Sequence, residues 1–173
     1  MGTKHHFFKN IIAGSIAVFP DGAAALNRAC CLENLGRYSD ALPLYRELAD
    51  RDELAGIVNG CNCLMKMGDK AGALEYATRA TTLFPADPDS WIAVGNVCFS
   101  LDSWKDALDA YMHAHQIDSD NPTPPYNAAL TGLRMKNMEL AKRALQAFLA
   151  LAPPDDARRS WAQRCFQELL NST

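Results

Sequence analysis

The segment WIAVGNVCFSLDSWKDALDAYMHA, residues 91–114, is followed by the similar segment YNAALTGLRMKNMELAKRALQAFLA, residues 126–150. When the two are aligned on a shared alanine, Ala107 corresponds to Ala141, 34 residues later. The same step of 34 residues leads back to Ala73 in GDKAGALEYATRA, and a step of 32 leads on to Ala41 in GRYSDALPLYREL. Self-similarity at a fixed spacing of this length indicates a repeat architecture.

This spacing divides the chain into an array and two ends. We expect four repeats, over residues 22–53, 54–87, 88–121 and 122–153. An N-terminal helical segment, 1–21, precedes them, and a C-terminal capping helix, 154–173, follows them. A single repeat cannot bury its apolar side, so stacking of neighbours must form the core.

Small residues recur at two positions of each repeat. Position 20, on the second helix, is always alanine, as described above. Position 8, on the first helix, is occupied by Ala29, Cys61, Gly95 and Ala129. Two helices of a hairpin approach closely only where their side chains are small, so these residues predict the contact points within each pair. The aromatic residues of the repeats are interpreted as packing residues.

These features resemble the tetratricopeptide repeat family. The W-x2-L-G-x2-Y opening of that family is matched best by Trp91, Val94, Gly95 and Cys98, and its closing proline by Pro85 and Pro153. The resemblance covers about four-fifths of the chain. It implies an all-α fold, a right-handed α-solenoid of helical hairpins that acts in protein–protein interaction.

Composition and charge narrow the class of protein. The chain has 173 residues, of which 49% are hydrophobic and 21% charged, as in a folded globular protein. A net charge of −3 and a pI near 5.8 argue against a nucleic-acid partner. The longest mainly apolar run, residues 11–19, is too short to span a membrane, so no membrane insertion is expected.

The six cysteines do not form a zinc-binding pattern, and we interpret them as buried free thiols of a cytoplasmic protein. His113 and His115 are two residues apart on one helix and cannot converge on one ion. No nucleophile lies near a base at a motif spacing. We therefore expect no metal, no cofactor and no enzymatic activity.

The N-terminal segment leaves alternatives open. We favour a helix that packs on the array or mediates dimer contacts, so a homodimer remains one candidate assembly. The other interpretation is a secretory signal, because basic residues and an apolar run precede an A-x-A at residues 23–25.

In the family that the chain resembles, the first helix of each repeat lines a concave groove. The corresponding positions here combine apolar side chains with a row of asparagines. An asparagine amide offers both a donor and an acceptor to the backbone of an extended peptide. The plainer interpretation is that asparagine is a tolerated polar residue on a solvated face. The candidate groove residues are Leu26, Asn27, Val58, Asn59, Asn62, Ile92, Asn96, Tyr126, Asn127 and Leu130.

Heat-shock co-chaperones with this kind of repeat use basic residues at positions 2, 5 and 6 to hold a C-terminal carboxylate. Those positions here include Ala23, Val58, Asp89 and Ala93, so that clamp is absent.

The third and fourth repeats resemble more closely the class II chaperones of bacterial type III secretion. DSDNPTPPYNAAL, residues 118–130, matches their D-x3-P-x2-P-aromatic-x-AA junction, and FFKN followed by GSIA is similar to their opening helix. The resemblance implies that a segment of a hydrophobic translocator lies in the groove. That family usually has three repeats, whereas four are counted here, and its N-terminal glycine pair is reduced to Gly14.

Two functions follow from this interpretation. The first is a module that binds an extended, partly apolar peptide, as a secretion chaperone does for its translocator. The alternative is a scaffold or assembly protein that joins subunits of a complex or self-associates.

Overall fold

The computed structural model describes residues 22–171, and the N-terminal segment predicted over 1–21 lies outside these residues. Within the described range the chain forms nine helices and no strand. The helices are α2 (Gly22–Asn34), α3 (Tyr38–Asp50), α4 (Leu54–Met67), α5 (Lys70–Leu83), α6 (Pro88–Ser100), α7 (Trp104–Ile117), α8 (Thr123–Arg134), α9 (Met138–Leu151) and α10 (Arg159–Asn171).

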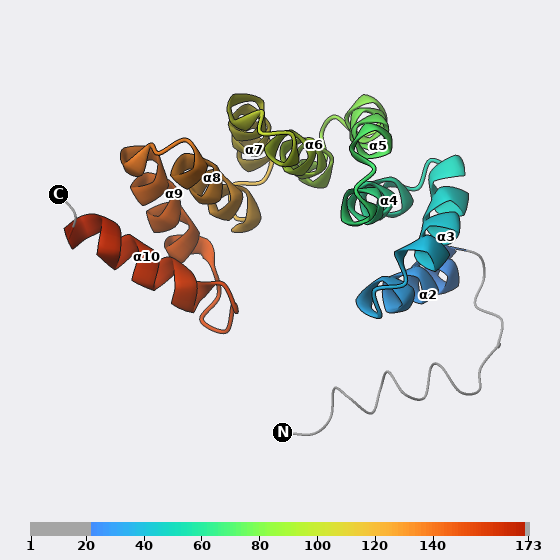
Figure 1. Ribbon diagram of the computed structural model, residues 1–173, viewed down its shortest axis with the longest axis horizontal. Coiled ribbons are helices and arrows are strands. Elements are labelled where there is room, and N and C mark those ends of the chain that lie inside the picture. The colour runs from blue at the N-terminus through green and yellow to red at the C-terminus, as the bar shows by residue number, and fades with distance from the viewer. Residues whose placement is uncertain (1–21, 172–173) are drawn as a thin grey trace, which may run out of the picture.

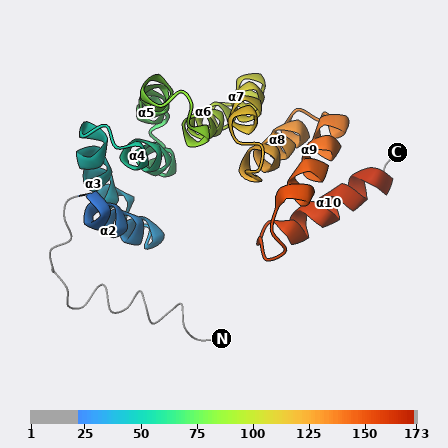
Figure 2. The same ribbon diagram turned by 180° about the vertical axis from the view of Figure 1, so that it is seen from behind.

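Consecutive helices pair and stack into an open arc (Figure 1). The first helices of the pairs, seen most clearly for α4 and α6, lie toward the inside of the arc, whereas α5 and α7 lie outside. The view from behind shows the same arrangement, with α2 and α10 at opposite ends (Figure 2). The predicted all-α repeat fold is confirmed, and it places one face of each first helix on the concave side.

The small residues predicted at the helix contacts are buried. The four position-20 alanines and three of the position-8 residues, Ala29, Cys61 and Ala129, are 0% exposed. In the second repeat the Cys61 thiol donates to the carbonyl oxygen of Ala73 at 3.3 Å, so α4 and α5 meet at these two positions. The sequence therefore identified where the helices of a pair approach each other.

The core continues from one pair of helices to the next. One buried cluster joins residues of α2 to α6, among them Tyr45, Leu48 and Val97. A second cluster joins residues of α7 to α10, among them Tyr111 and Phe148, and side chains of α6 pack against it. Each pair of helices thus buries the apolar side of its neighbour, as stacked repeats must.

The turn between the two helices of each pair has the same backbone conformation. One residue of each turn has a positive φ: +73° at Gly36, +82° at Gly68, +58° at Asp102 and +56° at Lys136. This left-handed conformation is easy for glycine and unfavourable for other residues, yet the turn keeps it in all four pairs. The shared turn gives the four hairpins a common geometry.

The last helix closes the C-terminal end of the array. α10 packs against α9 with Ala162 fully buried and with Trp161, Cys165 and Phe166 packed against the second core cluster. It lies within the range predicted for a capping helix. No helix within residues 22–171 is long and apolar enough to cross a membrane.

The contact at Gly95 gives a test of the packing. A Cβ atom added at Gly95 would lie 2.3 Å from Cε1 of Tyr111, a ring that is only 2% exposed. We expect Gly95→Ala to lower the free energy of unfolding by about 1–3 kcal/mol, because the crowding exceeds the gain in helix propensity. Urea unfolding followed by circular dichroism measures this.

The double variant Gly95→Ala/Tyr111→Leu is the control. It removes the ring that the new methyl group meets, so its loss of stability should be smaller than the sum of the two single losses. Strict additivity would contradict a direct contact.

Candidate functional site

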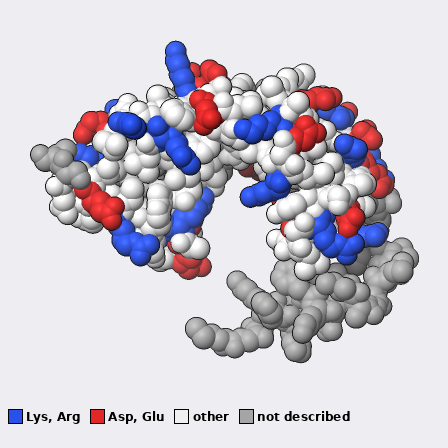
Figure 3. All heavy atoms as spheres, in the orientation of Figure 1, with Lys and Arg blue, Asp and Glu red and all other residues white. Residues whose placement is uncertain are grey.

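The inner helices line a hollow of about 500 Å³ on the concave side of the arc. The space-filling view shows that the arc is open in the middle and that its charges of both signs are interspersed (Figure 3). Side chains from α2, α4, α6, α7 and α8 contribute to this hollow, so it extends across all four pairs of helices. Its lining residues are Glu33, Asn62, Met65, Lys66, Asn96, Phe99, Ser100, Tyr111, Asn127 and Leu130.

Four of the candidate groove residues meet in this hollow: Asn62, Asn96, Asn127 and Leu130. The candidates came from positions 5, 6 and 9 of the repeats. The other lining residues of the first helices occupy positions 12 and 13, about one turn further along the same helices. Reading those positions along the same face would have found Glu33, Met65 and Phe99. Tyr111 comes from a second helix, and a single-helix pattern could not indicate it.

The remaining candidates lie nearer the N-terminal ends of the first helices. Leu26 and Val58 pack against the first core cluster, and Ile92 is only 9% exposed. Asn27 is exposed and Asn59 is half-buried, and neither lines the hollow. The tenth candidate, Tyr126, packs against the C-terminal end, as described below.

The asparagines of the third and fourth repeats bond to each other. The Tyr111 hydroxyl donates to Oδ1 of Asn96 at 2.9 Å, and Nδ2 of Asn127 donates to the same oxygen at 3.2 Å. These two donors orient the Asn96 amide. Within residues 22–171 this leaves the N–H groups of Asn96, together with the side-chain carbonyl oxygen and second N–H of Asn127, for an incoming ligand.

A second buried tyrosine holds a side chain of the first repeat. The Tyr45 hydroxyl donates to Oε2 of Glu33 at 2.7 Å, and its oxygen lies 3.5 Å from Sγ of Cys30. Burial raises the pKa of Tyr45, and the hydrogen bond to Glu33 raises it further, so the hydroxyl remains a donor. Tyr45 and Tyr111 occupy the same position of their repeats, and both reach through the hairpin to the concave face.

The hollow combines three kinds of side chain. Met65, Phe99 and Leu130 are apolar, the three asparagines offer amides, and Glu33 and Lys66 carry opposite charges. Arg134 lies over the Phe99 ring, with its guanidinium carbon 5.9 Å from the ring centroid. Such a surface can take an apolar side chain and hydrogen-bond to an extended backbone at the same time.

The described residues contain no group of three His, Cys, Asp or Glu side chains that could hold a metal ion. The ring of His113 packs edge-to-face against Trp91, with centroids 4.1 Å apart and ring planes at 62°, which gives that histidine a packing role. All six cysteines are free, and burial raises the pKa of Cys61 to about 12, so this side chain stays a thiol.

Sequence comparison decides the family. The family model described as "Tetratricopeptide repeat" matches residues 12–55 and 64–122, more than half of the chain. The chain belongs to the tetratricopeptide repeat family. No curated protein is significantly similar to it in sequence.

Solved tetratricopeptide repeat structures share its fold at low identity. A thermophilic protein of this family from Thermus thermophilus is 19% identical, covers 88% of this chain and 82% of its own, and has a TM-score of 0.73. MamA from Desulfovibrio magneticus is 17% identical over 79% and 78% of the two chains, with a TM-score of 0.64.

The Yersinia enterocolitica type III secretion chaperone SycD, solved with a peptide of the translocator YopD, is 16% identical. It covers 70% of this chain and 92% of its own, with a TM-score of 0.61. At these identities the likeness shows the repeat fold alone.

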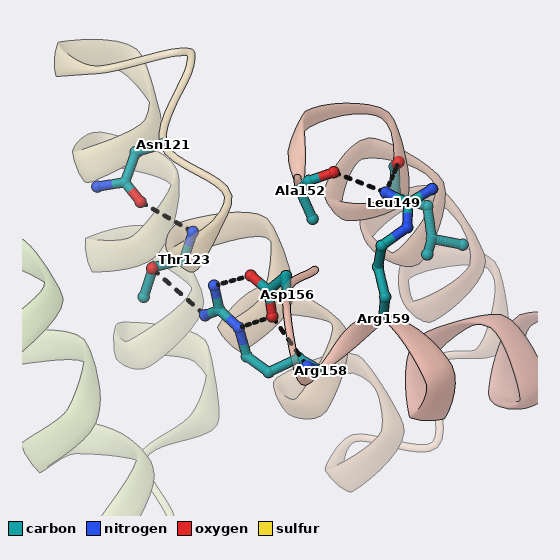
Figure 4. Close-up of polar contacts among 7 residues, drawn as sticks. All are labelled: Asn121, Thr123, Leu149, Ala152, Asp156, Arg158 and Arg159. Atoms are coloured by element: carbon teal, nitrogen blue, oxygen red, sulfur yellow. Dashed lines mark hydrogen bonds and ion pairs between the residues drawn. The ribbon is translucent and has the colours of Figure 1, made fainter. Parts of the chain in front are cut away.

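The last tetratricopeptide repeat is joined to α10 by two arginines (Figure 4). Arg158 bonds both carboxylate oxygens of Asp156, at 2.7 and 3.0 Å, and lies over the rings of Tyr126 and Phe148, at 5.1 and 5.2 Å. Tyr126 also contacts Phe148 and Trp161, with centroids 5.1 and 5.5 Å apart. The candidate groove residue Tyr126 is thus part of the contact between the array and its cap.

Arg159 completes this junction from the other side. Its Nη1 donates to the carbonyl oxygens of Leu149 and Ala152, both at 2.7 Å (Figure 4). These carbonyls are at the C-terminal end of α9, where no further helical N–H is available to them. The two arginines therefore fix the path of the chain from α9 into α10.

This junction predicts an acid-sensitive contribution to stability. The hydrogen bonds from the side chain and backbone of Arg158 lower the pKa of Asp156 from 3.8 to about 2. Because the pKa of the Asp156 carboxyl group is lower in the folded state than in the unfolded state, its charge stabilises the folded state at pH values above the unfolded-state pKa. This stabilisation is lost as the pH falls through about 2. We expect Asp156→Asn to be less stable than the wild type at pH 5, with the difference shrinking between about pH 4 and pH 2.

Urea unfolding followed by tryptophan fluorescence across this pH range measures the difference. Asp155→Asn is the matched control, since it removes the same charge from an exposed neighbouring position. Equal pH profiles for the two variants would contradict the junction described here.

Proposed function

We propose that this tetratricopeptide repeat protein binds an extended, partly apolar peptide in its concave hollow, and that it is a type III secretion chaperone for a hydrophobic translocator protein. The observation that carries the proposal is the hollow itself. It brings three apolar side chains and three asparagine amides from successive repeats onto one continuous surface.

The asparagines suit a peptide backbone of varied sequence. A backbone offers one N–H and one C=O per residue, and the available groups of Asn96 and Asn127 include both a donor and an acceptor. The apolar side chains of Met65, Phe99 and Leu130 then supply anchoring contacts, each worth about 1.5–3 kcal/mol when fully buried. Hydrogen bonds to the backbone, combined with a few apolar anchors, give tight binding while placing few requirements on the peptide sequence. A chaperone for an unfolded segment needs this combination.

Three observations support the secretion assignment. The fold is similar to that of SycD, whose solved complex holds a peptide of the translocator YopD. The junction that resembles this class, residues 118–130, forms the entry to α8, with Pro124 and Pro125 buried. All six cysteines are free, which fits work in the reducing cytoplasm.

The alternative of a scaffold or assembly protein is favoured by a different surface. The residue before each positive-φ turn residue is a large, exposed apolar side chain in all four hairpins. These residues are Leu35, Met67, Leu101 and Met135, with exposed fractions of 62%, 46%, 41% and 37%. A regular apolar row of this kind on the edge of the array suits contact with further subunits.

The variant Leu130→Asp tests the chaperone proposal. A carboxylate at this position faces the apolar part of the hollow, so we expect affinity for the client to fall at least about tenfold. The measurement is recovery of complexes from cells of origin under gentle conditions, with co-purifying proteins identified and quantified by mass spectrometry.

Met112→Asp is the matched control, because Met112 is 52% exposed on α7 and does not line the hollow. A single apolar, membrane-active client that is retained by the control and lost from Leu130→Asp supports the chaperone. Several soluble partners, or only copies of the chain itself, retained by both variants would favour the scaffold instead.

A further inference from the structure

The two charges that line the hollow are not neutralised by each other. Glu33 on α2 and Lys66 on α4 both contribute to its surface, yet they form no ion pair. Within residues 22–171 the Glu33 carboxylate has no ion-pair partner at all, and Arg37, in the turn that follows α2, is paired with Asp40 at 2.6 Å. Among the described residues, therefore, no cation pairs with this half-buried carboxylate, which faces the hollow.

The position of Glu33 is unfavourable for its own helix. It lies in the last turn of α2, where the negative end of the helix dipole disfavours an anion. Lys66 and Arg134 lie in the last turns of α4 and α8, where the negative end of the helix dipole favours a cation. The corresponding residues of the next two repeats, Met65 and Phe99, are apolar. Helix stability therefore does not explain the carboxylate at this position.

Tyr45 fixes the carboxylate in place. Its hydroxyl donates to Oε2 at 2.7 Å from a residue that is 0% exposed, so the carboxylate cannot turn far into solvent. Satisfying the tyrosine hydroxyl needs only an acceptor, which glutamine would also supply. What glutamate adds to the hollow is a fixed negative charge, and a partly desolvated charge of this kind gains most from a cationic hydrogen-bond partner.

We propose that Glu33 determines the specificity of the groove by pairing with a lysine or arginine of the client, near an apolar residue that occupies the space between Met65, Phe99 and Leu130. The inference rests on the proposed peptide-binding function and adds the chemistry of the client: an apolar and basic segment. Neighbouring packed helices lie about 8–10 Å apart, and an extended chain advances about 3.3 Å per residue, so the basic residue falls about three to six residues from the apolar one.

Synthetic peptides test this directly. The probes are fluorescein-labelled 12-residue peptides of Ser, Ala and Gly with one leucine and, three to six residues away, one Lys, Gln or Glu. Fluorescence anisotropy in 50 mM salt measures their affinity for the full chain. For at least one spacing we expect the Lys peptide to bind about tenfold more tightly than the Glu peptide, with the ratio shrinking in 300 mM salt.

The variants assign the effect to one carboxylate. Glu33→Gln keeps the acceptor for Tyr45 and removes the charge, so the Lys-to-Glu preference should fall to about one. Glu33→Lys should reverse it. Tyr45→Phe releases the carboxylate and should weaken the Lys-to-Glu preference. Glu75→Gln, an exposed glutamate on α5 outside the hollow, is the matched control and should behave as wild type.

The outcomes separate the inference from the function on which it rests. Suppose that the peptides bind to the wild type and that Leu130→Asp abolishes this binding. If the Lys and Glu peptides then bind equally, or if their difference persists in Glu33→Gln, the proposed role of Glu33 is wrong but the proposed peptide-binding groove is supported. If no peptide of any charge binds the wild type, both the groove proposal and the specificity proposal fail.

Discussion

The close approach of the two helices within each hairpin is the constraint on which the structure depends. It is possible only because alanine, cysteine or glycine occupies the contact positions, as the buried pair Cys61 and Ala73 shows. Once the hairpins are closed in this way, each has an apolar side that only another hairpin can cover. The result is an arc whose length grows by one pair of helices at a time and whose inner face is made by the first helix of each pair.

The same close packing connects the core to the concave face. Tyr45 and Tyr111 come from the second helices, yet their hydroxyls bond to Glu33 and Asn96 on the first. A tyrosine is long enough to cross the hairpin only because small residues leave room for its ring, as Gly95 does for Tyr111. Polar side chains in the hollow are therefore oriented from behind by buried groups. This preorganisation reduces the ordering that binding would otherwise require.

Charged side chains help to hold the C-terminal end of the array together, whereas apolar stacking holds its interior together. The apolar side of the last pair of helices is covered by α10, which takes the place that a neighbouring repeat has elsewhere in the array. Arg158 and Arg159 hold the turn that leads into α10, one through Asp156 and two aromatic rings, the other through the free carbonyls of α9. The cap thus engages Tyr126, a residue whose position in the repeat would otherwise assign it to the groove.

The sequence by itself determined the repeat spacing, the buried contact positions and the helical hairpins, because each depends on residues close together in the chain and recurs every repeat. It also indicated the concave face and four of the residues that meet there, among them Asn96 and Leu130. Only the tertiary structure decided that Tyr45 holds Glu33 in the hollow, that Tyr111 orients Asn96, and that Tyr126 belongs to the cap. Each of these contacts joins side chains from different helices. Such contacts depend on helix stacking angles and side-chain rotamers, which a repeating sequence pattern does not specify.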